Sequence, residues 1–502
     1  MAPIPSPIDP RSTPLSFWTK LAFGAGDLGT AITANLQVFY LLYFFTSVAG
    51  LNPGLAGGIL LIGKVWDAIN DPIVGILSDR TRSSWGRRYP WMLWASLPFG
   101  LSFFLMWLVP VEGEWGLFWY YSLMAIIFNT TYTAVNLPYT ALTAELTQDY
   151  NERTSLNSFR FFFSIGGSIL SLILAQVVFA QVRDPALRYP VLGAICAVVS
   201  VLPIYWCVWG TKGRTLGVDR GRQNQKRRNP ERGNQGQQKQ ANIPLATDSS
   251  MPISQQLRIA FNNRPFLFVI GIYLCSWLGV QVTATVIPYF VIYWMGFAEE
   301  NMTPVLLAVQ GTALVMLFVW SAVSQRVGKK VTYFAGTGLW ILAQAGLFFL
   351  QPGQTVWLYG LAIVAGCGVS TAYLIPWSMV PDVIDLDELE TGQRREGVFY
   401  GFMVLLQKLG LALGLFLVGK SLDLAGFVST SAGEAVSQQP DSALFAIRVA
   451  IGPVPTVCLV CGLVLAYFYP INQAMHQDIL LKLQERRQSR SIEGPYSDAA
   501  DS

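Results

Sequence analysis

The chain has 502 residues, of which 52% are hydrophobic and only 13% are charged, and its mean hydropathy is +0.42. Soluble proteins carry about 25% charged residues, so this composition predicts a membrane protein. The single histidine, His476, lies near the C-terminus, which argues against zinc, haem and serine-hydrolase enzymes because their sites need histidine within the fold. The net charge of +4 does not indicate a nucleic-acid partner, because the basic residues fall between apolar segments.

Apolar segments of about 20 residues or more predict twelve membrane-spanning helices, and therefore an all-α membrane protein. The polar, Pro-rich residues 1–16 lack a cleavable signal pattern, so the first span is expected to stay in the mature protein. In chain order the predicted spans are 17–46, 54–78, 89–109, 115–145, 155–181, 189–210, 265–294, 303–325, 330–350, 354–381, 396–422 and 444–470.

A polar segment at 211–264, rich in Arg, Lys, Gln and Asn, divides the chain. Such a composition cannot bury a core, and it predicts a disordered cytoplasmic loop with one surface helix near 252–262. A basic segment can also bind nucleic acid, although a solvated loop fits its position between spans better. The predicted organisation is a tail at 1–16, six-helix bundles at 17–210 and 265–470, and a tail at 471–502.

Basic residues mark one side of the predicted topology. They gather in the connections that follow the even-numbered spans, as Arg80, Arg153 and Lys330 illustrate, whereas Arg183 and Arg188 are exceptions on the opposite side. Because cytoplasmic loops carry the excess of Lys and Arg, both termini are expected in the cytoplasm. We expect a multi-pass protein of a bacterial-type inner membrane that acts as a monomer.

The second predicted span contains three ionisable residues, Lys64, Asp67 and Asp71. At about 100° per residue, all three fall on one face of a helix. Ionisable groups at membrane depth are costly and are retained where they line a pathway or bind an ion. The pattern predicts a cation site beside the path of a small-molecule solute. The alternative is a set of ion pairs that only holds the helices together.

The loop after the second span has the sequence GILSDRTRSSWGRR from Gly75 to Arg88, and a degenerate copy follows the eighth span at Trp320–Lys330. With twelve spans and a long central loop, this sequence resembles the signature loop of the major facilitator superfamily. The resemblance implies two six-helix bundles around a midplane cavity that opens alternately to each side. It also implies that Asp79 and Arg80 stabilise one access state through acidic–basic contacts.

Three further sequences resemble the glycoside–pentoside–hexuronide:cation symporters, the melibiose-permease-like branch of the superfamily. They are KLAFGAGDLG at Lys20–Gly29, WDAINDP at Trp66–Pro72 and RSSWGRRYPW at Arg82–Trp91. The resemblance implies symport of a sugar or related polar solute with Na⁺ or H⁺, and no cofactor or metal beyond that ion. Lys408 matches a family lysine near the cation, and we assign it to coupling together with Lys64. The predicted cation ligands are Asp67, Asn70, Asp71, Thr133 and Asn136.

The sugar site of that family is only partly present. Its first-span carboxylate, a stacking tryptophan and a third acidic residue fall on Ala31, Thr140 and Asn136. Arg160 is kept, and Asp27 lies one helical turn before Ala31, where it could supply the missing carboxylate. The predicted substrate residues are therefore Asp27, Asn136, Arg160 and Tyr373.

Other sequences resemble the animal sodium-dependent lysophosphatidylcholine symporters of the same superfamily. They lie at Leu137–Thr143, Leu374–Asp385 and Ser421–Phe427, and they make a lysolipid the alternative substrate. Near the end of the tenth span, Asp382 and Asp385 predict a salt-bridged gate between the halves. Two other classes are a lipid-modifying membrane enzyme and a scramblase, and gradient-driven uptake of a solute would separate a symporter from both.

Overall fold

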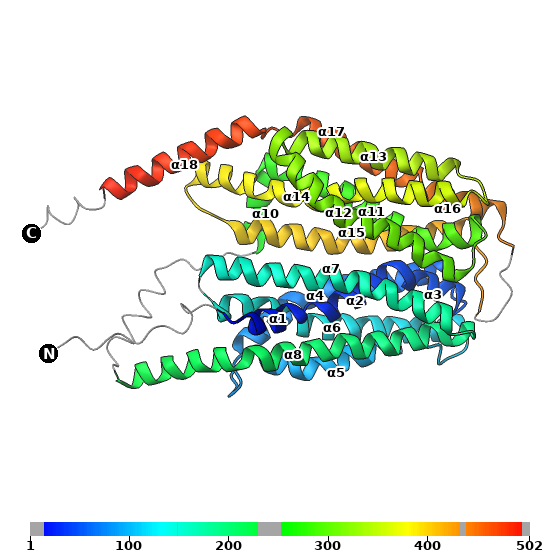
Figure 1. The fold of residues 1–502 in the computed structure, drawn as a ribbon, viewed down its shortest axis with the longest axis horizontal. Helices are drawn as coiled ribbons and strands as arrows, with labels where there is room; N and C mark the ends of the chain where they lie inside the picture. The colour runs from blue at the N-terminus through cyan, green and yellow to red at the C-terminus, as the bar shows by residue number, and fades with distance from the viewer. Residues whose placement is uncertain (1–14, 148, 229–252, 432–437, 494–502) are drawn as a thin grey trace, which may run out of the picture.

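A computed structural model describes residues 15–147, 149–228, 253–431 and 438–493. Within these residues the chain is helical, and its β-type pairing is limited to an isolated bridge between Ala49 and Ser431. The helices run nearly parallel in two groups, one from the first half of the chain and one from the second half (Figure 1). The all-helical architecture expected from the apolar segments is present.

The first half begins with an interrupted helix. A Cβ on Gly26, between α1 and α2, would lie 2.5 Å from the Tyr139 ring, so glycine permits the close packing at this break. The interruption places Asp27 at the start of α2. The elements are α1 (Phe17–Ala25), α2 (Leu28–Leu36), the π-helical turn η2 (Gln37–Leu41), α3 (Leu42–Ser47), α4 (Pro53–Arg80), α5 (Tyr89–Leu105), α6 (Glu114–Leu146), α7 (Tyr150–Gln181) and α8 (Pro185–Arg228).

The second half repeats the pattern of long helices, and its last predicted span is broken between Ile451 and Pro453. The elements are α10 (Ile253–Asn262), α11 (Arg264–Tyr289), the π-helical turn η3 (Phe290–Trp294), the 3₁₀ turn η4 (Glu299–Asn301), α12 (Met302–Val327), α13 (Lys329–Phe349), α14 (Thr355–Thr391), α15 (Glu396–Leu424), α16 (Asp441–Ile451), α17 (Pro453–Phe468) and α18 (Gln473–Glu493).

Two polar segments are more helical than predicted. Helix α8 continues to Arg228, into the segment expected to be a disordered loop, because its Arg, Lys and Gln residues have high helix propensity. The predicted C-terminal tail contains α18. The surface helix expected near 252–262 is α10. Residues 229–252, the rest of the predicted loop, lie outside the described residues.

Nine helical segments of the described chain are long and apolar enough to cross a membrane: Phe17–Ser47, Ser155–Gln181, Pro185–Arg214, Arg264–Trp294, Glu299–Val327, Lys329–Phe349, Thr355–Thr391, Glu396–Leu424 and Asp441–Phe468. The other three predicted spans are the helices α4, α5 and α6. Helix α4 carries several charges, and α5 has only 17 residues. The total of twelve spans therefore stays a prediction.

Helices α4 and α15 pack against each other, as do α7 and α12, and α11 packs against η2; all three contacts join the halves. The α4–α15 contact is close because it is built on glycines. A Cβ on Gly419 would lie 2.5 Å from the Pro53 carbonyl oxygen and 3.0 Å from the Gly57 Cα. The two backbones therefore meet almost directly.

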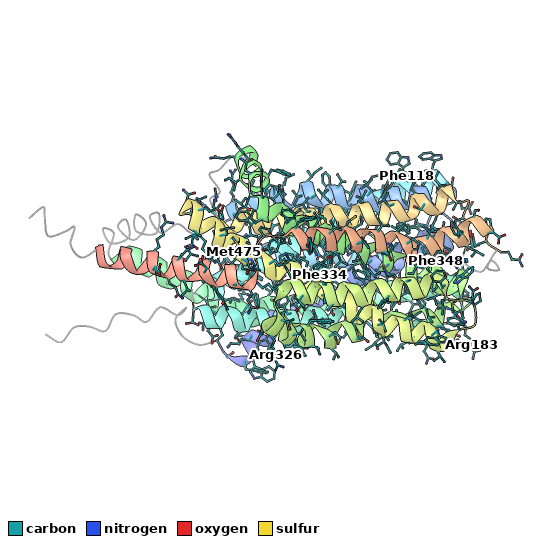
Figure 2. The ribbon with its side chains drawn as sticks, turned by 90° about the horizontal axis from the view of Figure 1, so that it is seen from above. Phe118, Arg183, Arg326, Phe334, Phe348 and Met475 are labelled. Carbon is teal, nitrogen blue, oxygen red and sulfur yellow. The ribbon has the colours of Figure 1, made fainter. Side chains whose placement is uncertain are left out.

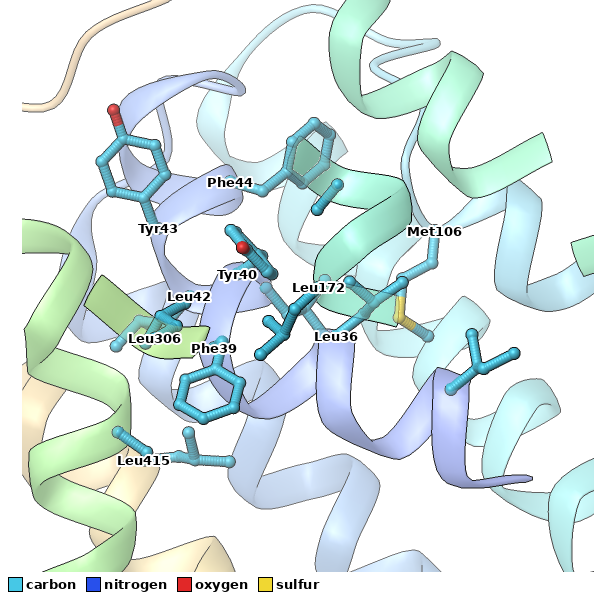
Figure 3. Close-up of a cluster of buried hydrophobic side chains, with 14 of the residues drawn as sticks. Leu36, Phe39, Tyr40, Leu42, Tyr43, Phe44, Met106, Leu172, Leu306 and Leu415 are labelled. Carbon is cyan, nitrogen blue, oxygen red and sulfur yellow. The ribbon is translucent and has the colours of Figure 1, made fainter. Parts of the chain in front are cut away.

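The halves share a hydrophobic core near one end of the bundle, which we call the closed end. It is the end where residues 48–52 and 425–431 connect the helices. Leu306 and Leu415 of the second half pack there among Leu36, Tyr40 and neighbouring side chains of the first half (Figure 3). At the opposite end, which we call the terminal end, α8 and α18 extend away from the bundle (Figure 1).

The terminal end is organised differently. The core cluster that includes Met379, Phe399 and Ile479 consists entirely of second-half residues. Arg326 and Met475 mark this end, whereas Arg183 and Phe348 lie near the closed end (Figure 2). Each half is thus packed within itself at the terminal end, whereas the closed end holds the two halves together.

We expect Gly419→Ala to destabilise the protein by about 1–3 kcal/mol, the usual cost of overpacking, because the new methyl group meets the Pro53 carbonyl. The control is Gly401→Ala on the same helix, where nothing lies within 4 Å of the added Cβ. Thermal unfolding of the detergent-purified variants measures the difference. Equal melting temperatures for the two variants would contradict the close α4–α15 contact.

Candidate functional site

The two carboxylates of α4 converge on one hydroxyl group. Asp67 is buried, Asp71 lies one turn later, and Thr133 on α6 faces both. The Thr133 Oγ1 atom is 3.1 Å from Asp67 Oδ1 and 3.0 Å from Asp71 Oδ1. Because a hydroxyl has one proton, Thr133 can donate to only one carboxylate at a time. The second carboxylate therefore needs another positive or protonated partner.

Lys408 on α15 supplies that partner from the other half of the protein. Its Nζ lies 2.9 Å from Asp67 Oδ2 and also contacts Asp71 Oδ2. The side chains of Lys408 and Asp71 are 21% and 24% exposed, whereas that of Asp67 is 4% exposed. One ammonium group therefore holds both carboxylates and links the two halves.

The other predicted members of the cation site surround these groups. Lys64 does not join the carboxylates directly, because its Nζ donates instead to Asn129 Oδ1 at 3.2 Å. Among the described atoms, the buried Asn70 Nδ2 and Asn136 Oδ1 have no hydrogen-bond partner. Amide oxygens such as Asn136 Oδ1 are hard ligands of the kind that Na⁺ prefers.

The helices themselves also prepare the site. Asn52 caps α4, accepting hydrogen bonds from the Gly54 and Leu55 N–H groups, and Pro53 occupies the first turn. Pro72 directly follows Asp71 inside the helix. Because proline has no N–H, the carbonyl of Ala68 lacks its usual helical donor beside the carboxylates. The WDAINDP sequence thus supplies both the charged groups and a freed backbone oxygen.

Asp27 and Arg160 form a separate ion pair in the first half. Arg160 Nε donates to Asp27 Oδ2 at 3.1 Å, and Thr30 Oγ1 donates to Asp27 Oδ1 at 3.0 Å. Asp27 is buried, but the Arg160 side chain is 27% exposed and lies over the Tyr139 ring at 5.7 Å. The structure therefore brings two predicted substrate residues together.

Tyr132 on α6 is close to both charged groups of the first half. Its hydroxyl is within electrostatic range of Asp27 and Arg160 and also of Asp67 and Asp71. Sequence reasoning missed this residue, because a tyrosine in an aromatic-rich span carries no distinguishing signal. It makes the Asp27–Arg160 pair a neighbour of the cation site.

Tyr373 lies in the second half beside an aromatic residue that sequence reasoning also missed. Its ring is 5.8 Å from that of Trp277 on α11 in an edge-to-face arrangement. Trp277 Nε1 donates to the Gln407 carbonyl at 3.1 Å, next to Lys408. Tyr373 is thus connected to the coupling lysine, whereas the described contacts do not bring it to Asp27 or Arg160.

The predicted gating residues pair within their own halves. Asp79 binds Arg88 of the following loop at 2.5 Å, and Arg88 also approaches Glu145 on α6 at 3.5 Å. Arg80 is exposed at the end of α4. The partners Arg88 and Glu145 were not predicted, although the basic loop sequence placed Arg88 near the end of the span.

Asp382 and Asp385 likewise bind groups of the second half. Lys329 Nζ lies 2.7 Å from Asp382 Oδ1, and Arg394 Nη1 lies 3.1 Å from Asp385 Oδ1. His476 on α18 lies 3.4 Å from Asp382 and 3.2 Å from Asp385. In this conformation the acidic cluster makes these pairs within the second half, and its predicted role as a gate between the halves stays a prediction.

A family model described as MFS/sugar transport protein matches residues 22–473 of the chain. The chain belongs to the MFS/sugar transport protein family. This confirms the resemblance to the major facilitator superfamily inferred from the loop after the second span. As a member of this family the protein is a multi-pass membrane transporter and not an enzyme.

Relatives of this transporter include symporters of different named substrates. An uncharacterized symporter of Synechocystis, sll1374, is 50% identical, and the match covers 95% of this chain and 98% of the relative. The putative glycoside/cation symporter YagG of Escherichia coli is 27% identical, with 98% and 100% covered. The sodium-dependent lysophosphatidylcholine symporter 1-A of Danio rerio is 26% identical, with 97% and 92% covered.

The fold of the transporter also matches solved structures. The crystal structure of the nucleoside transporter NupG aligns with a TM-score of 0.60 over 90% of this chain and 98% of its own, at 12% identity. At that identity the match shows a common fold and nothing about substrate.

We expect Lys408→Gln to destabilise the transporter in ion-free buffer, because it leaves two adjacent carboxylates without their shared ammonium. Breaking an exposed ion pair costs about 1 kcal/mol of stability, and breaking a fully buried one costs about 3–5 kcal/mol. Because this pair is partly exposed, the loss of stability should fall between these values. Added Na⁺ or lower pH should restore much of it, since either neutralises the carboxylates.

The matched control for this variant is Lys420→Gln. Lys420 is on the same helix, and its pair with Asp423 is exposed, so its loss should matter little. Thermal unfolding with and without Na⁺, at two pH values, separates the two variants. A Lys408→Gln protein as stable as Lys420→Gln and indifferent to Na⁺ would argue against a shared carboxylate site.

Proposed function

We propose that this transporter is a symporter in which Na⁺ or H⁺ binds at Asp67 and Asp71 and drives uptake of a sugar or related polar solute. The observation that carries the proposal is the position of Lys408, whose Nζ contacts both carboxylates from the opposite half. A cation that binds these oxygens must displace that ammonium. Binding of the ion would therefore alter a contact between the two halves, as coupled transport requires.

Charge balance supports the competition between ion and lysine. Asp67 and Asp71 lie within electrostatic range of Lys64 as well as in contact with Lys408, so basic groups already accompany the two carboxylates when the site holds no ion. An arriving cation adds a positive charge and repels Lys408, since like charges within a few ångströms are costly in a low-dielectric interior. Asn70, Thr133 and Asn136 would supply neutral ligands to the ion.

The Asp27–Arg160 pair is the proposed centre of the substrate site, and Asn136 and Tyr373 are the other residues that we propose contact the substrate. A carboxylate and a guanidinium together offer acceptors and donors, which suits a polyhydroxylated solute. Arg160 uses its Nε for Asp27 and is part-exposed, so its terminal nitrogens can donate to a substrate. Because ion and substrate sites are neighbours, binding of either should strengthen binding of the other by the same factor.

For the membrane arrangement we propose twelve spans in two six-helix bundles, at 17–210 and 265–470, with the terminal end in the cytoplasm. The distribution of Lys and Arg supports this orientation. A bacterial-type inner membrane is the proposed location, and a monomer the proposed functional unit.

A lysophospholipid is the second candidate substrate. The relative named as a lysophosphatidylcholine symporter covers nearly the whole chain, and Ala31 and Thr140 replace residues of the sugar site. Thermal shift of the purified protein with a panel of glycosides and lysolipids, each with and without Na⁺, distinguishes the two. Stabilisation by a lysolipid and by no sugar would overturn the sugar assignment.

We expect Asp71→Asn to abolish gradient-driven accumulation of the identified substrate in proteoliposomes, because an amide has neither the negative charge that would exchange Lys408 for Na⁺ nor a site that takes up H⁺. The control is Asp441→Asn, which changes an exposed aspartate at the start of α16. Accumulation by Asp71→Asn at the level of the control would refute the ion-site assignment.

We expect Arg160→Gln to weaken substrate binding by about 10- to 100-fold, the loss associated with one or two hydrogen bonds to a charged group. The same variant should keep the Na⁺-dependent thermal shift, since Arg160 does not contact the α4 carboxylates. Arg153→Gln on the same helix changes an exposed arginine and serves as control. Loss of the Na⁺ response together with substrate binding would show that the two sites are not separable.

A further inference from the structure

The segment after α15 crosses the closed end and lies against the first half. Helix α15 ends at Leu424, and residues 425–431 then pass beside residues 46–51, which comprise the last two residues of α3 and the four residues after it. Ala49 and Ser431 form an antiparallel bridge. Within the described residues this bridge is the one β-type pairing, and it joins the two halves of the transporter.

Further hydrogen bonds join residues on either side of this bridge. The Thr430 N–H donates to the Thr46 carbonyl at 3.1 Å, and the Thr430 hydroxyl donates to the Ser47 carbonyl at 3.2 Å. The Ser429 hydroxyl donates to the Leu51 carbonyl at 2.8 Å. Three acceptors on one half are thus matched by donors on consecutive residues of the other.

A left-handed glycine follows each of the two helices that bring these segments together. Gly50 and Gly426 have φ values of +71° and +76°, the left-handed conformation that favours glycine. After each glycine the chain turns back, with the Leu51 N–H bound to the Phe45 carbonyl and the Phe427 N–H bound to the Leu422 carbonyl. The Phe427–Leu422 bond is the six-residue hydrogen bond of a glycine helix end, whereas the Leu51–Phe45 bond closes a turn one residue longer. Each turn directs the following residues across the boundary between the halves.

An aromatic contact seals the inner side of the segment. The Phe427 ring, which is 6% exposed, lies 5.4 Å from Tyr289 and 5.1 Å from Tyr293 in edge-to-face arrangements. Tyr289 and Tyr293 in turn hydrogen-bond to Thr46 and Ser47 at 2.7 and 2.8 Å. Backbone and side-chain contacts therefore converge on the same few residues of the first half.

The segment is also held firmly to its own half. The side-chain amide of Gln439 accepts from the Val428 N–H at 2.9 Å and donates to the Val428 carbonyl at 2.8 Å. If the closed end opens, the segment should stay with the second half while its bonds to residues 46–51 break. Those bonds then act as a latch whose release is part of opening.

We propose that residues 425–431 form a strap that serves as the outer gate of the transport cycle, with Phe427 as its anchor on the second-half residues Tyr289 and Tyr293 and with Thr430 and Ser431 as its attachment to the first half. The proposal rests on the proposed function in taking the closed end as the outer side. Outward opening requires breaking the Thr430–Thr46 backbone bond and separating Tyr289 and Tyr293, together with Phe427, from Thr46 and Ser47. The strap thereby favours the conformation open at the terminal end.

The first test is a reversible disulfide across the bridge, Ala49→Cys with Ser431→Cys. After oxidation, and once the disulfide is verified by mass spectrometry, the double variant should lose uptake, and reductant should restore it. Oxidised single variants are the controls and should transport normally. A verified disulfide that leaves uptake unchanged would overturn the strap as a gate. Absence of gradient-driven uptake by the unmodified protein would instead refute the proposed function.

The second test does not require uptake. Thr303→Cys places a thiol at a buried cross-half position, where Thr303 bonds Tyr40 at 2.9 Å. Adding Thr430→Pro, which removes the backbone bond to Thr46, should speed its labelling by a membrane-impermeant maleimide by about fivefold, as expected for the loss of one hydrogen bond worth about 1 kcal/mol. Phe427→Ala, which removes the ring contacts with Tyr289 and Tyr293, should also speed the labelling. Val428→Ala, which keeps the backbone bonds to Gln439, is the matched control. Labelling unaffected by both strap variants would overturn the proposal.

Discussion

Burying two carboxylates inside a membrane protein costs free energy, and Lys408 offsets that cost. The rest of the arrangement depends on this contact. Removing a charge from water costs several kcal/mol unless a partner with good geometry compensates it. Here a single ammonium from α15 contacts Asp67 and Asp71 on α4. Because the partner comes from the other half, the electrostatic stability of the site and the relative position of the halves cannot be changed independently.

The two ends of the bundle differ in how their polar groups are satisfied. At the closed end, donors and acceptors are matched across the halves, as in the contacts of Tyr43 and Arg188 with Glu299. At the terminal end, the described acidic groups find partners within their own half, as Asp387 does with Arg395 at 2.5 Å. Separation of the halves at the terminal end therefore leaves these charges paired, whereas separation at the closed end would not. The pairing of charges therefore resists separation of the halves more strongly at the closed end than at the terminal end.

The sequence was sufficient to predict features that follow from local rules. Charges at helical spacing in an apolar span identified Asp67 and Asp71, and the WDAINDP and signature-loop sequences identified the family. Features that depend on contacts between distant segments could not be predicted from the sequence. Nothing local indicates that Asp27 pairs with Arg160, that Asp79 binds Arg88, or that His476 lies between two carboxylates.

Local sequence rules also failed to predict where the helices end in the polar segments. The same composition that predicted a disordered loop supports the continuation of α8, because Arg, Lys and Gln are both well solvated and good helix formers. Whether such residues form a helix depends on whether an existing helix precedes them, since nucleation is the costly step. A long span supplies that nucleus for α8, and docking of Ile479 and Leu483 on the second half supports α18.

The central ion pair and the closed end together suggest why a cation alone need not open the transporter outward. Displacing Lys408 would weaken one contact between the halves, but the shared core around Tyr40 and Leu306 and the contacts of residues 46–51 with Thr430 would remain. A ligand shifts a conformational equilibrium only by its differential affinity for the two states. In the proposed mechanism the ion would remove one contact that favours the present state, and the substrate would have to contribute the rest through its own contacts. If neither ion nor substrate alone provides enough binding energy to open the closed end, only the two together can do so. The strength of the closed end would then couple transport of the substrate to transport of the ion.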